Sequence, residues 1–221
     1  VSIQTPIGLL IAAFLSSKDL RFKHTYRTLI FLPAMMSIVI VGYLFNLILS
    51  NLWGIPQTIL GVVGLEHLYQ PWLGLKGPAL ITISLISIWQ FVGIPMMLFY
   101  AALLNIPDEI LDAAKIDGSG PMTTFWFVKF PLILPTVGLM VILTYVGNYN
   151  AFDLIFAMKS LYAGPEYSTD LMGTFFYRTF FGFQMQLGNP TMGATVASTT
   201  FGIILLGVLI YLFAFQQRVT R

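Results

Sequence analysis

The sequence predicts an all-α integral membrane protein, and three observations carry this prediction. The chain of 221 residues is 57% hydrophobic and only 9% charged, whereas soluble domains carry about 25% charged residues. Its mean hydropathy is +0.83. Several apolar runs reach or approach the roughly 20 residues that one membrane-spanning helix needs. We therefore expect one transmembrane domain over residues 1–221, built as a bundle of helices.

The apolar runs predict about five spans. The first run, residues 1–15, is short and is interrupted by Pro6 and Gly8. We expect it to be the end of a span whose beginning lies before Val1. The other spans are predicted at residues 29–49, 77–104, 132–157 and 192–215.

Two features modify this simple pattern. Residues 50–77 contain Trp53 and Trp72 among several glycines and prolines, which predicts a re-entrant or interfacial excursion with tryptophan at headgroup level. Pro95 lies inside the predicted span 77–104 and is expected to kink it. The backbone carbonyl that such a proline frees can be satisfied by a neighbouring helix.

Composition also excludes several classes of protein. The absence of cysteine excludes disulfides, thiolate metal sites and a cysteine nucleophile. The only histidines, His24 and His67, do not form a His-Glu-x-x-His motif, so we predict no metal site and no catalytic residues. No Gly-x-x-x-x-Gly-Lys-Ser/Thr loop is present, so this chain itself holds no nucleotide by that route. Its net charge of +2, with no basic cluster, does not favour nucleic acid as a partner.

The longest polar interruption of the central part of the chain is residues 106–135. Four of the nine acidic residues fall within it, together with one lysine, Lys115, in the window 107–118. Pro107 suits the first position of a helix, and acidic residues in the first turn suit the helix dipole. Gly118 is expected to end this helix in a left-handed conformation. The acidic residues are Asp108, Glu109, Asp112 and Asp117.

This short helix is predicted to be amphipathic and to lie outside the lipid. Ile110, Leu111, Ala113 and Ala114 recur at helical spacing. Such a stripe can dock in a groove of another protein or rest on lipid headgroups. The net charge of −3 in the window favours docking, because helices that lie on membranes are usually rich in Lys and Arg.

A second candidate site is the far half of the predicted span 132–157. Aromatic rings and amides gather there, and uncharged amides with aromatic rings suit a neutral polyol such as a sugar. Two other interpretations stay open, because tyrosines are common at membrane interfaces and polar side chains also join helices. The candidate residues along this substrate path are Tyr145, Asn148, Tyr149, Asn150, Phe152 and Asp153, with Tyr145, Tyr149 and Phe152 on one helical face.

The distribution of Lys and Arg predicts the orientation. Eight of these residues fall on the side of the 106–135 loop and three on the other side. This places the loop and the C-terminus in the cytoplasm. The eight are Lys18, Arg21, Lys23, Arg27, Lys115, Lys129, Arg218 and Arg221, and the three are Lys76, Lys159 and Arg178.

The 106–135 segment resembles the "EAA" loop of bacterial ABC-importer permeases. The family pattern is Glu-Ala-Ala, two residues, Asp-Gly-Ala, and then Phe-x-x-Ile-x-Leu-Pro. Here it reads Asp112-Ala113-Ala114, Asp117-Gly118-Ser119 and Phe125-x-x-Val128-x-Phe130-Pro131. The acid at 112 is the departure that bears on docking. Ile106-Pro107 and the Asn-Ala-Phe-Asp at 150–153 resemble the maltose, glycerol-phosphate and lactose branch, and the resemblance covers nearly the whole chain.

The resemblance implies a type I importer transmembrane domain, which in this family has six spans and a cytoplasmic coupling helix. It implies docking on an ATPase subunit through Glu109, Asp112, Ala113, Ala114, Asp117 and Gly118. It also implies contact with an extracytoplasmic solute-binding protein near Gly164-Pro165, through Glu166, Thr169 and Asp170, although a simple solvated loop fits those residues as well.

The implied assembly is a pair of permease chains, usually different from each other, with two ATPase subunits that hold ATP and Mg²⁺ and a binding protein that delivers a carbohydrate. The implied location is the bacterial cytoplasmic membrane, with lipid around the spans. A secondary transporter or channel is the alternative, but the predicted spans hold almost no ionisable groups that could couple to an ion. A scaffold or an intramembrane enzyme is a third interpretation, and the sequence offers no pair of a nucleophile and a base for the latter.

Overall fold

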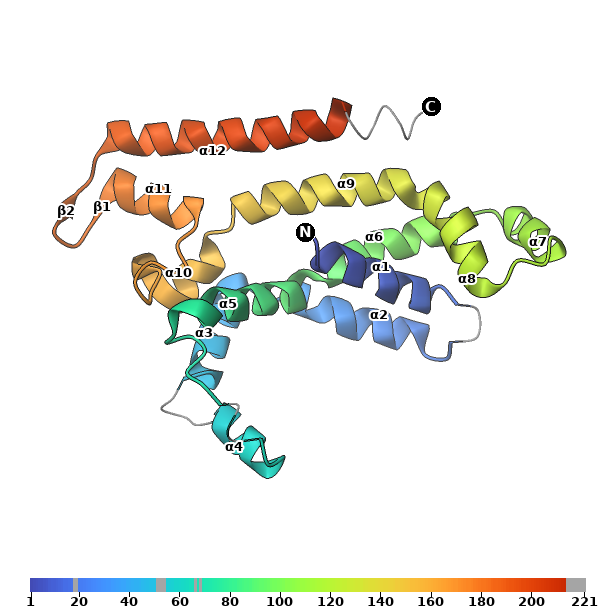
Figure 1. Cartoon of the computed structure of the whole chain (residues 1–221), viewed down its shortest axis with the longest axis horizontal. Coiled ribbons are helices and arrows are strands. Elements are labelled where there is room, and N and C mark those ends of the chain that lie inside the picture. The colour runs from blue at the N-terminus through green and yellow to red at the C-terminus, as the bar shows by residue number, and fades with distance from the viewer. Residues whose placement is uncertain (18–19, 51–54, 66, 68, 214–221) are drawn as a thin grey trace. The chain divides into compact units, whose positions relative to one another are not determined.

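The structure is a computed structural model that describes residues 1–17, 20–50, 55–65, 67 and 69–213. These residues form helices joined by short loops, with one two-stranded antiparallel hairpin, β1 (Gly182–Phe183) and β2 (Gln186–Leu187) (Figure 1). They divide into two compact units. The first comprises Val1–Met35, Gln90–Val146 and the described residues from Leu205 onward, and the second comprises Met36–Trp89 and Gly147–Ile204. This all-helical architecture confirms the predicted fold class.

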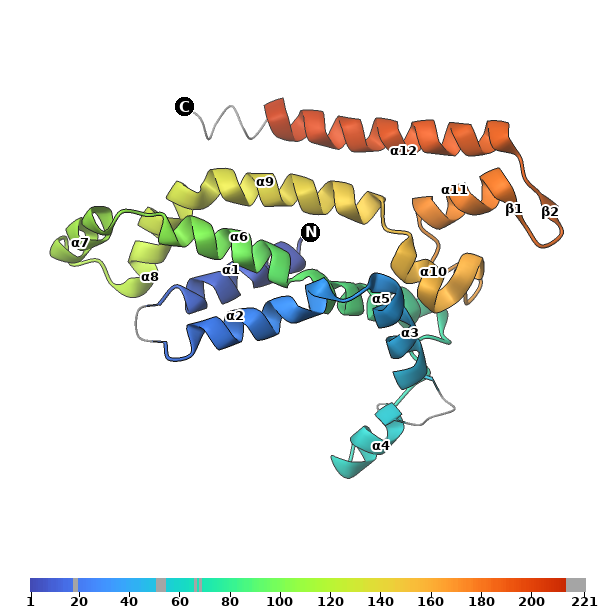
Figure 2. The same ribbon diagram turned by 180° about the vertical axis from the view of Figure 1, so that it is seen from behind.

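The first unit has its core where α1 (Gln4–Leu15) packs along α6 (Gly93–Leu104), an arrangement seen in both views (Figures 1 and 2). Gly8 allows the close approach, because a Cβ there would lie 2.9 Å from Pro95 Cγ. Ile133 and Met140, from α9 (Phe130–Tyr149), complete the buried cluster. The other members of this cluster are Ala12, Leu15, Met96, Phe99, Tyr100 and Leu103.

Pro95 disturbs the helix as expected, but the bend lies one turn before it. The predicted span 77–104 consists of α5 (Lys76–Phe91) and α6, which are bent by 40°. A proline cannot donate to the carbonyl four residues earlier, which here belongs to Phe91. Gln4 Nε2 donates to that Phe91 oxygen at 3.1 Å. A neighbouring helix therefore satisfies the freed carbonyl.

The predicted span 29–49 is not one continuous helix. The chain forms α2 (Lys23–Phe31), a 3₁₀ turn (Leu32–Met35) and α3 (Ile38–Ile48), and the two halves meet at 92°. Pro33 favours the end of α2, because its ring opposes the carbonyl of residue 29. Ser37 then adopts an extended conformation with ψ 129° before α3 begins. α2 also begins at Lys23, six residues before the predicted start of this span.

The second unit is centred on α3 and α10 (Asp153–Lys159). Gly42 brings them together, since a Cβ there would lie 2.7 Å from Ala157 Cβ. The buried cluster consists of Val41, Leu73, Ile83, Ile86, Leu154, Ile155, Met158 and Ala163. The excursion predicted for 50–77 contains α4 (Ile55–Val62), while Trp53 lies outside the described residues.

The predicted span 132–157 is also divided. α9 ends at Tyr149, and α10 begins at Asp153. Before α9, α8 (Pro121–Thr124) leads into a π-helical turn (Phe125–Lys129). After α10, a 3₁₀ turn (Ser160–Tyr162), α11 (Met172–Phe181) and the hairpin lead to α12 (Pro190–Tyr211). The described start of α12 agrees with the last predicted span, and Asn189 Oδ1 accepts a hydrogen bond from Met192 N at 3.0 Å, which caps this helix.

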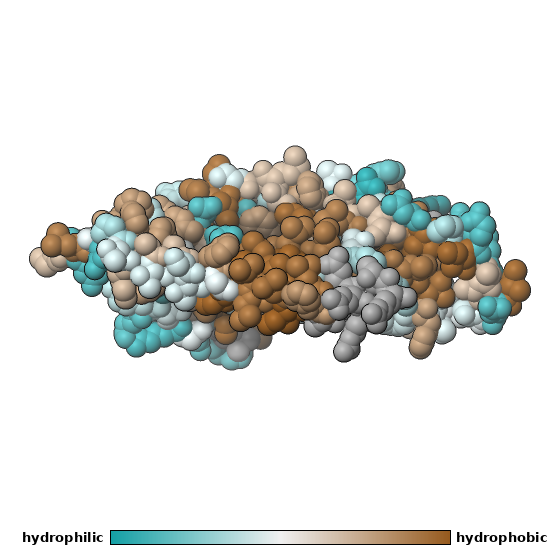
Figure 3. Space-filling model, turned by 90° about the horizontal axis from the view of Figure 1, so that it is seen from above, coloured by the Kyte–Doolittle hydropathy of each residue, from teal (hydrophilic) through white to brown (hydrophobic). Residues whose placement is uncertain are grey.

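Apolar side chains cover much of the surface seen in Figure 3. On α12, for example, Phe201, Leu206 and Ile210 are 66%, 60% and 58% exposed. Such surfaces are stable when lipid rather than water surrounds them. Among the described residues, two helices qualify as spans by length and composition, and up to four if each bent pair counts as one; α1 is a shorter apolar helix. The number of about five spans stays a prediction.

Candidate functional site

The polar loop contains the predicted amphipathic helix. It is α7 (Asp108–Ile116), with Asp108 and Glu109 in its first turn and Lys115 in its last turn. Pro107 was expected at the first helical position but occupies the N-cap, one residue earlier. Both charge placements complement the helix dipole.

Gly118 ends this helix through a Schellman motif. Its φ is +76°, in the left-handed region where a residue without Cβ is favoured. The Gly118 N–H donates to Lys115 O and the Ser119 N–H donates to Ala114 O, both at 3.0 Å. These two bonds satisfy carbonyls that the last turn of a helix leaves free. The predicted left-handed stop is confirmed.

The two faces of α7 differ in exposure. Ala114 is 7% exposed and Leu111 is half-buried, so these residues anchor the helix to its own chain. Glu109, Asp112 and Ala113 are exposed on the opposite side. Ile116 is 86% exposed and was not among the residues predicted for docking. Its position seven residues after Glu109, on the same face, was the available signal.

Asp112 is already engaged on α7. Lys115 Nζ donates to Asp112 Oδ1 at 2.7 Å, and the two side chains are 66% and 61% exposed. An exposed pair at this spacing stabilises a helix by only about 0.3–0.5 kcal/mol. Breaking this ion pair therefore costs little free energy, so Asp112 remains able to pair with a basic residue of another protein.

The residues predicted along a substrate path lie in different local settings. In the first unit, Tyr145 packs against α12 where Gly207 leaves room for its ring. In the second unit, Asn148 and Asn150 are exposed, and Tyr149 is half-buried. Asp153 is exposed at the start of α10.

Phe152 is not on the face of α9 where it was expected, because that helix ends three residues before it. Its ring stacks on Phe156 with centroids 5.2 Å apart and on Tyr177 at 5.4 Å. Tyr177 in turn contacts Phe181 at 4.8 Å. Phe152 therefore belongs to a row of aromatic rings that joins α10 and α11.

Glu166, Thr169 and Asp170, the residues predicted to contact a binding protein, lie in different local settings. Glu166 is exposed and forms an ion pair with Lys76. Thr169 is fully buried, with its Oγ1 3.3 Å from Gly164 O as the acceptor. Asp170 accepts hydrogen bonds from Arg178 Nη2 and Thr174 Oγ1, both at 2.6 Å. In this conformation only Glu166 presents its side chain for contact with another protein, and Thr169 and Asp170 hold the loop in shape.

The family described as "Binding-protein-dependent transport system inner membrane component" matches residues 4–220. The chain belongs to this family. As an inner membrane component, it places its exposed apolar helices in lipid.

Relatives within this transport family are named as permeases. The chain is 33% identical over 198 residues to the multiple sugar-binding transport system permease protein MsmF of Streptococcus mutans, covering 90% of this chain and 66% of the relative. It is 30% identical over 190 residues to the probable ABC transporter permease protein YurN of Bacillus subtilis, covering 86% of this chain and 64% of the relative. The matches thus span just under two thirds of these relatives.

A solved structure supports the fold. The chain superposes with a TM-score of 0.82 on a chain of a bacterial ABC transporter involved in the import of the acidic polysaccharide alginate. The match covers 100% of this chain and 74% of the other, at 20% identity. The helical arrangement is therefore that of an ABC importer's membrane component.

Proposed function

We propose that this chain is the membrane-spanning permease subunit of an ATP-driven importer that moves a sugar or oligosaccharide into the cytoplasm by alternating access. The observation that carries the proposal is α7, an acidic helix with an exposed face. Along the chain it lies between the apolar helices α6 and α9, and the chain belongs to the binding-protein-dependent transport family. The names of relatives such as the multiple sugar-binding system support a carbohydrate as substrate.

In this proposal α7 is the coupling helix. Glu109, Asp112 and Asp117 meet basic residues of an ATPase subunit, Ala113 keeps the contact close, and Ile116 enters an apolar pocket. In the proposed assembly, two partner ATPase subunits bind ATP and Mg²⁺ and hydrolyse the ATP, and this chain does neither. Closure of the ATPases then moves α7, and transport follows only if its contacts differ between the two states.

The test replaces Gly118 with valine. A β-branched residue at φ +76° is strained by about 1–3 kcal/mol, and no neighbouring atom lies within 4 Å of the new Cβ, so the effect is confined to the end of α7. We expect Gly118→Val to reduce co-purification of the ATPase and substrate-stimulated ATP hydrolysis by about tenfold, the equivalent of ~1.4 kcal/mol.

Gly120→Val is the matched control. Gly120 also has open space around its Cβ, but its φ of −71° suits valine. This variant should retain both association and hydrolysis. Normal association and hydrolysis in Gly118→Val would contradict the docking role of α7, and uptake that continues without ATP would favour a channel or secondary transporter.

The proposed substrate path includes Tyr145, Asn148, Tyr149, Asn150, Phe152 and Asp153, with the exposed amides as hydrogen-bonding groups for sugar hydroxyls. Asn148→Ala should lower uptake of the transported sugar by about 3- to 10-fold, as expected for one neutral hydrogen bond, while ATPase association stays intact. Leu143→Ala, at an exposed apolar position of the same helix, is the control. Equal uptake by the two variants would remove Asn148 from the path.

The proposed assembly also contains a second permease chain, expected to differ from this one, and an extracytoplasmic solute-binding protein. Glu166 is the residue of the outer loop placed to contact that binding protein, with Thr169 and Asp170 supporting the loop from inside. In the bacterial cytoplasmic membrane, α7 and the C-terminus then face the cytoplasm.

A further inference from the structure

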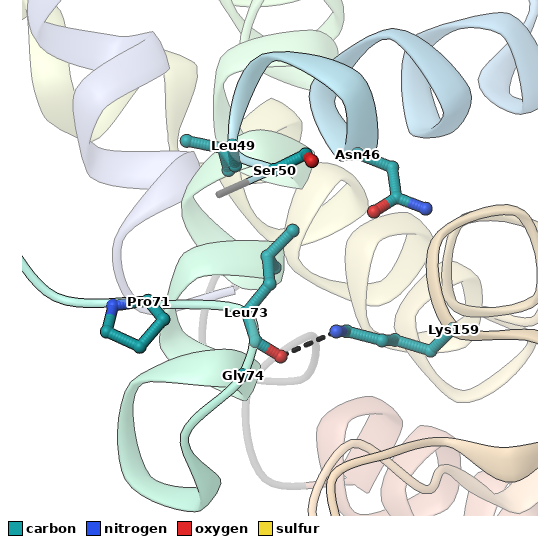
Figure 4. A pocket seen from close by; sticks show the side chains of 7 residues that line it. All are labelled: Asn46, Leu49, Ser50, Pro71, Leu73, Gly74 and Lys159. Carbon is teal, nitrogen blue, oxygen red and sulfur yellow. Dashed lines mark hydrogen bonds between the residues drawn. The ribbon is translucent and has the colours of Figure 1, made fainter. Parts of the chain in front are cut away.

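A pocket of about 300 Å³ lies in the second unit, and none of the residues proposed for docking or for the substrate path lines it. It is formed by the end of α3, the segment 71–74 and the end of α10 (Figure 4). Its polar side chains are Asn46, Ser50 and Lys159. A volume of this size lies at the lower end of the range for small-molecule sites.

Lys159 brings a positive charge to this pocket. Its Nζ donates to Leu73 O at 2.5 Å, the dashed line in Figure 4. A lysine ammonium has three N–H donors, and among the described residues Lys159 has no carboxylate partner. A partly buried ammonium without a counter-charge is unfavourable, so the pocket is suited to an anion.

Asn46 adds an acceptor. Its Nδ2 donates to Met158 O at 3.2 Å, which fixes the amide. Its oxygen points into the space above the bond between Lys159 and Leu73 (Figure 4). The pocket therefore offers a cation for a phosphate and an amide oxygen for a hydroxyl.

An apolar groove of about 570 Å³ adjoins this pocket, and Leu49 lines both. Phe45, Trp72, Ile81, Leu85 and Trp89 form most of its walls. Thr82 also lines it, but its hydroxyl donates to Pro78 O at 2.8 Å and so adds little polarity. The groove suits a hydrocarbon chain. Trp72 lines the groove, its chain neighbours Pro71 and Leu73 line the pocket, and a tryptophan is typical of the headgroup level.

We propose that this pair of cavities binds one anionic glycerophospholipid, such as phosphatidylglycerol. The phosphate pairs with Lys159, a headgroup hydroxyl donates to Asn46, and an acyl chain lies in the groove beside Ile81 and Leu85. Basic pockets among membrane helices bind anionic lipid headgroups in this way on the cytoplasmic side. The same pairing of charges is available on the opposite side, where the Lys and Arg distribution predicts Lys159. A helix of another protein would cover the groove but leave the charge of Lys159 unexplained.

The experiment extracts the full-length protein, with any chains that co-purify, into mild detergent and counts retained lipids by native mass spectrometry. Lys159→Gln should retain about tenfold less phosphatidylglycerol than wild type, as expected for one charge-assisted hydrogen bond. Lys159→Arg should retain it. Lys76→Gln, which removes an exposed lysine of the same unit that lines neither cavity, should match wild type.

A groove variant separates a lipid from a free anion. Leu85 is 56% exposed, so Leu85→Trp fills the groove without entering the core, and it should also reduce phosphatidylglycerol retention. Wild-type retention in Lys159→Gln overturns the proposal. Loss in Lys159→Gln with full retention in Leu85→Trp also overturns it, because the pocket would then bind only an anion such as inorganic phosphate.

A measurement on the wild-type protein covers the case in which Lys159→Gln does not fold. Phosphatidylglycerol added to delipidated protein should raise its melting temperature more than phosphatidylcholine or inorganic phosphate does. Equal effects of the two lipids would exclude recognition of the headgroup charge.

Discussion

Arg178 shows how one side chain can hold a loop that the sequence leaves undefined. It binds Asp170 Oδ2 at 2.6 Å, donates to Leu161 O at 3.0 Å, and lies over the ring of Tyr167 at 4.6 Å. The side chains of Arg178 and Asp170 are only 10% and 19% exposed. A planar guanidinium can make these contacts together, whereas a lysine cannot. From the sequence, Arg178 was predicted only to contribute to the orientation in the membrane.

Loss of this pair should destabilise the protein strongly. Arg178→Leu leaves the carboxylate of Asp170 largely buried without its partner, and we expect a loss of roughly 2–4 kcal/mol, just below the range for fully buried pairs. Thermal unfolding of the purified protein measures it. Lys76→Gln breaks the exposed pair with Glu166 and should cost less than about 1 kcal/mol. Similar shifts for both variants would refute the distinction.

At the scale of elements, the junction of α5 and α6 depends on a helix distant in sequence. Pro95 frees the Phe91 carbonyl, and Gln4 of α1 donates to it. Gln4 is itself 9% exposed. Pro95 of α6 and Gln4 of α1 therefore act together on the Phe91 carbonyl of α5, and this arrangement connects the three helices at the bend.

A double-mutant cycle tests this arrangement. Gln4→Leu leaves the Phe91 carbonyl unsatisfied and should destabilise the protein by about 1–3 kcal/mol. In a Pro95→Ala background the restored N–H can take over as donor, so the same change should cost clearly less. The melting temperatures of the four proteins give the coupling. Additive effects would show that Gln4 acts independently of Pro95.

Other elements show where hydrophobic pattern is insufficient. The runs 29–49 and 132–157 are apolar throughout their centres, and the pattern predicts continuous helices there. The structure breaks the first run near Pro33 and the second run between Tyr149 and Asp153. The helices that follow these two breaks, α3 and α10, pack on each other through Gly42 and Ala157. The hydrophobic pattern of a segment shows how apolar the segment is. Whether its helix bends depends on which residues each half contacts.

For the whole molecule, the central prediction is the orientation across the membrane. The chain has no cysteine, so single cysteines can report topology without background. Met122, within the polar loop 106–135, and Met185, in the β-hairpin, are 70% and 101% exposed. In spheroplasts, whose cytoplasmic membrane is intact, a membrane-impermeant maleimide should label Met185→Cys.

The reagent should label Met122→Cys only after the membrane is permeabilised. The Lys and Arg distribution is the reason for this expectation. The reverse pattern would invert the protein and remove α7 from the compartment that contains ATP. Labelling of both cysteines in intact spheroplasts would indicate a leaky preparation, which an unlabelled cytoplasmic control protein detects.

The sequence by itself determined the helical membrane class, α7 and its Gly118 stop, because these depend on composition and on contacts within a few residues. Only the tertiary structure decided which residues are available to partners: it buried Thr169, paired Asp170 with Arg178, exposed Ile116, placed Phe152 outside α9 and assembled the Lys159 pocket. The physical reason is that exposure and partnership depend on neighbours far away in the chain. The local sequence does not show which distant residues these neighbours are.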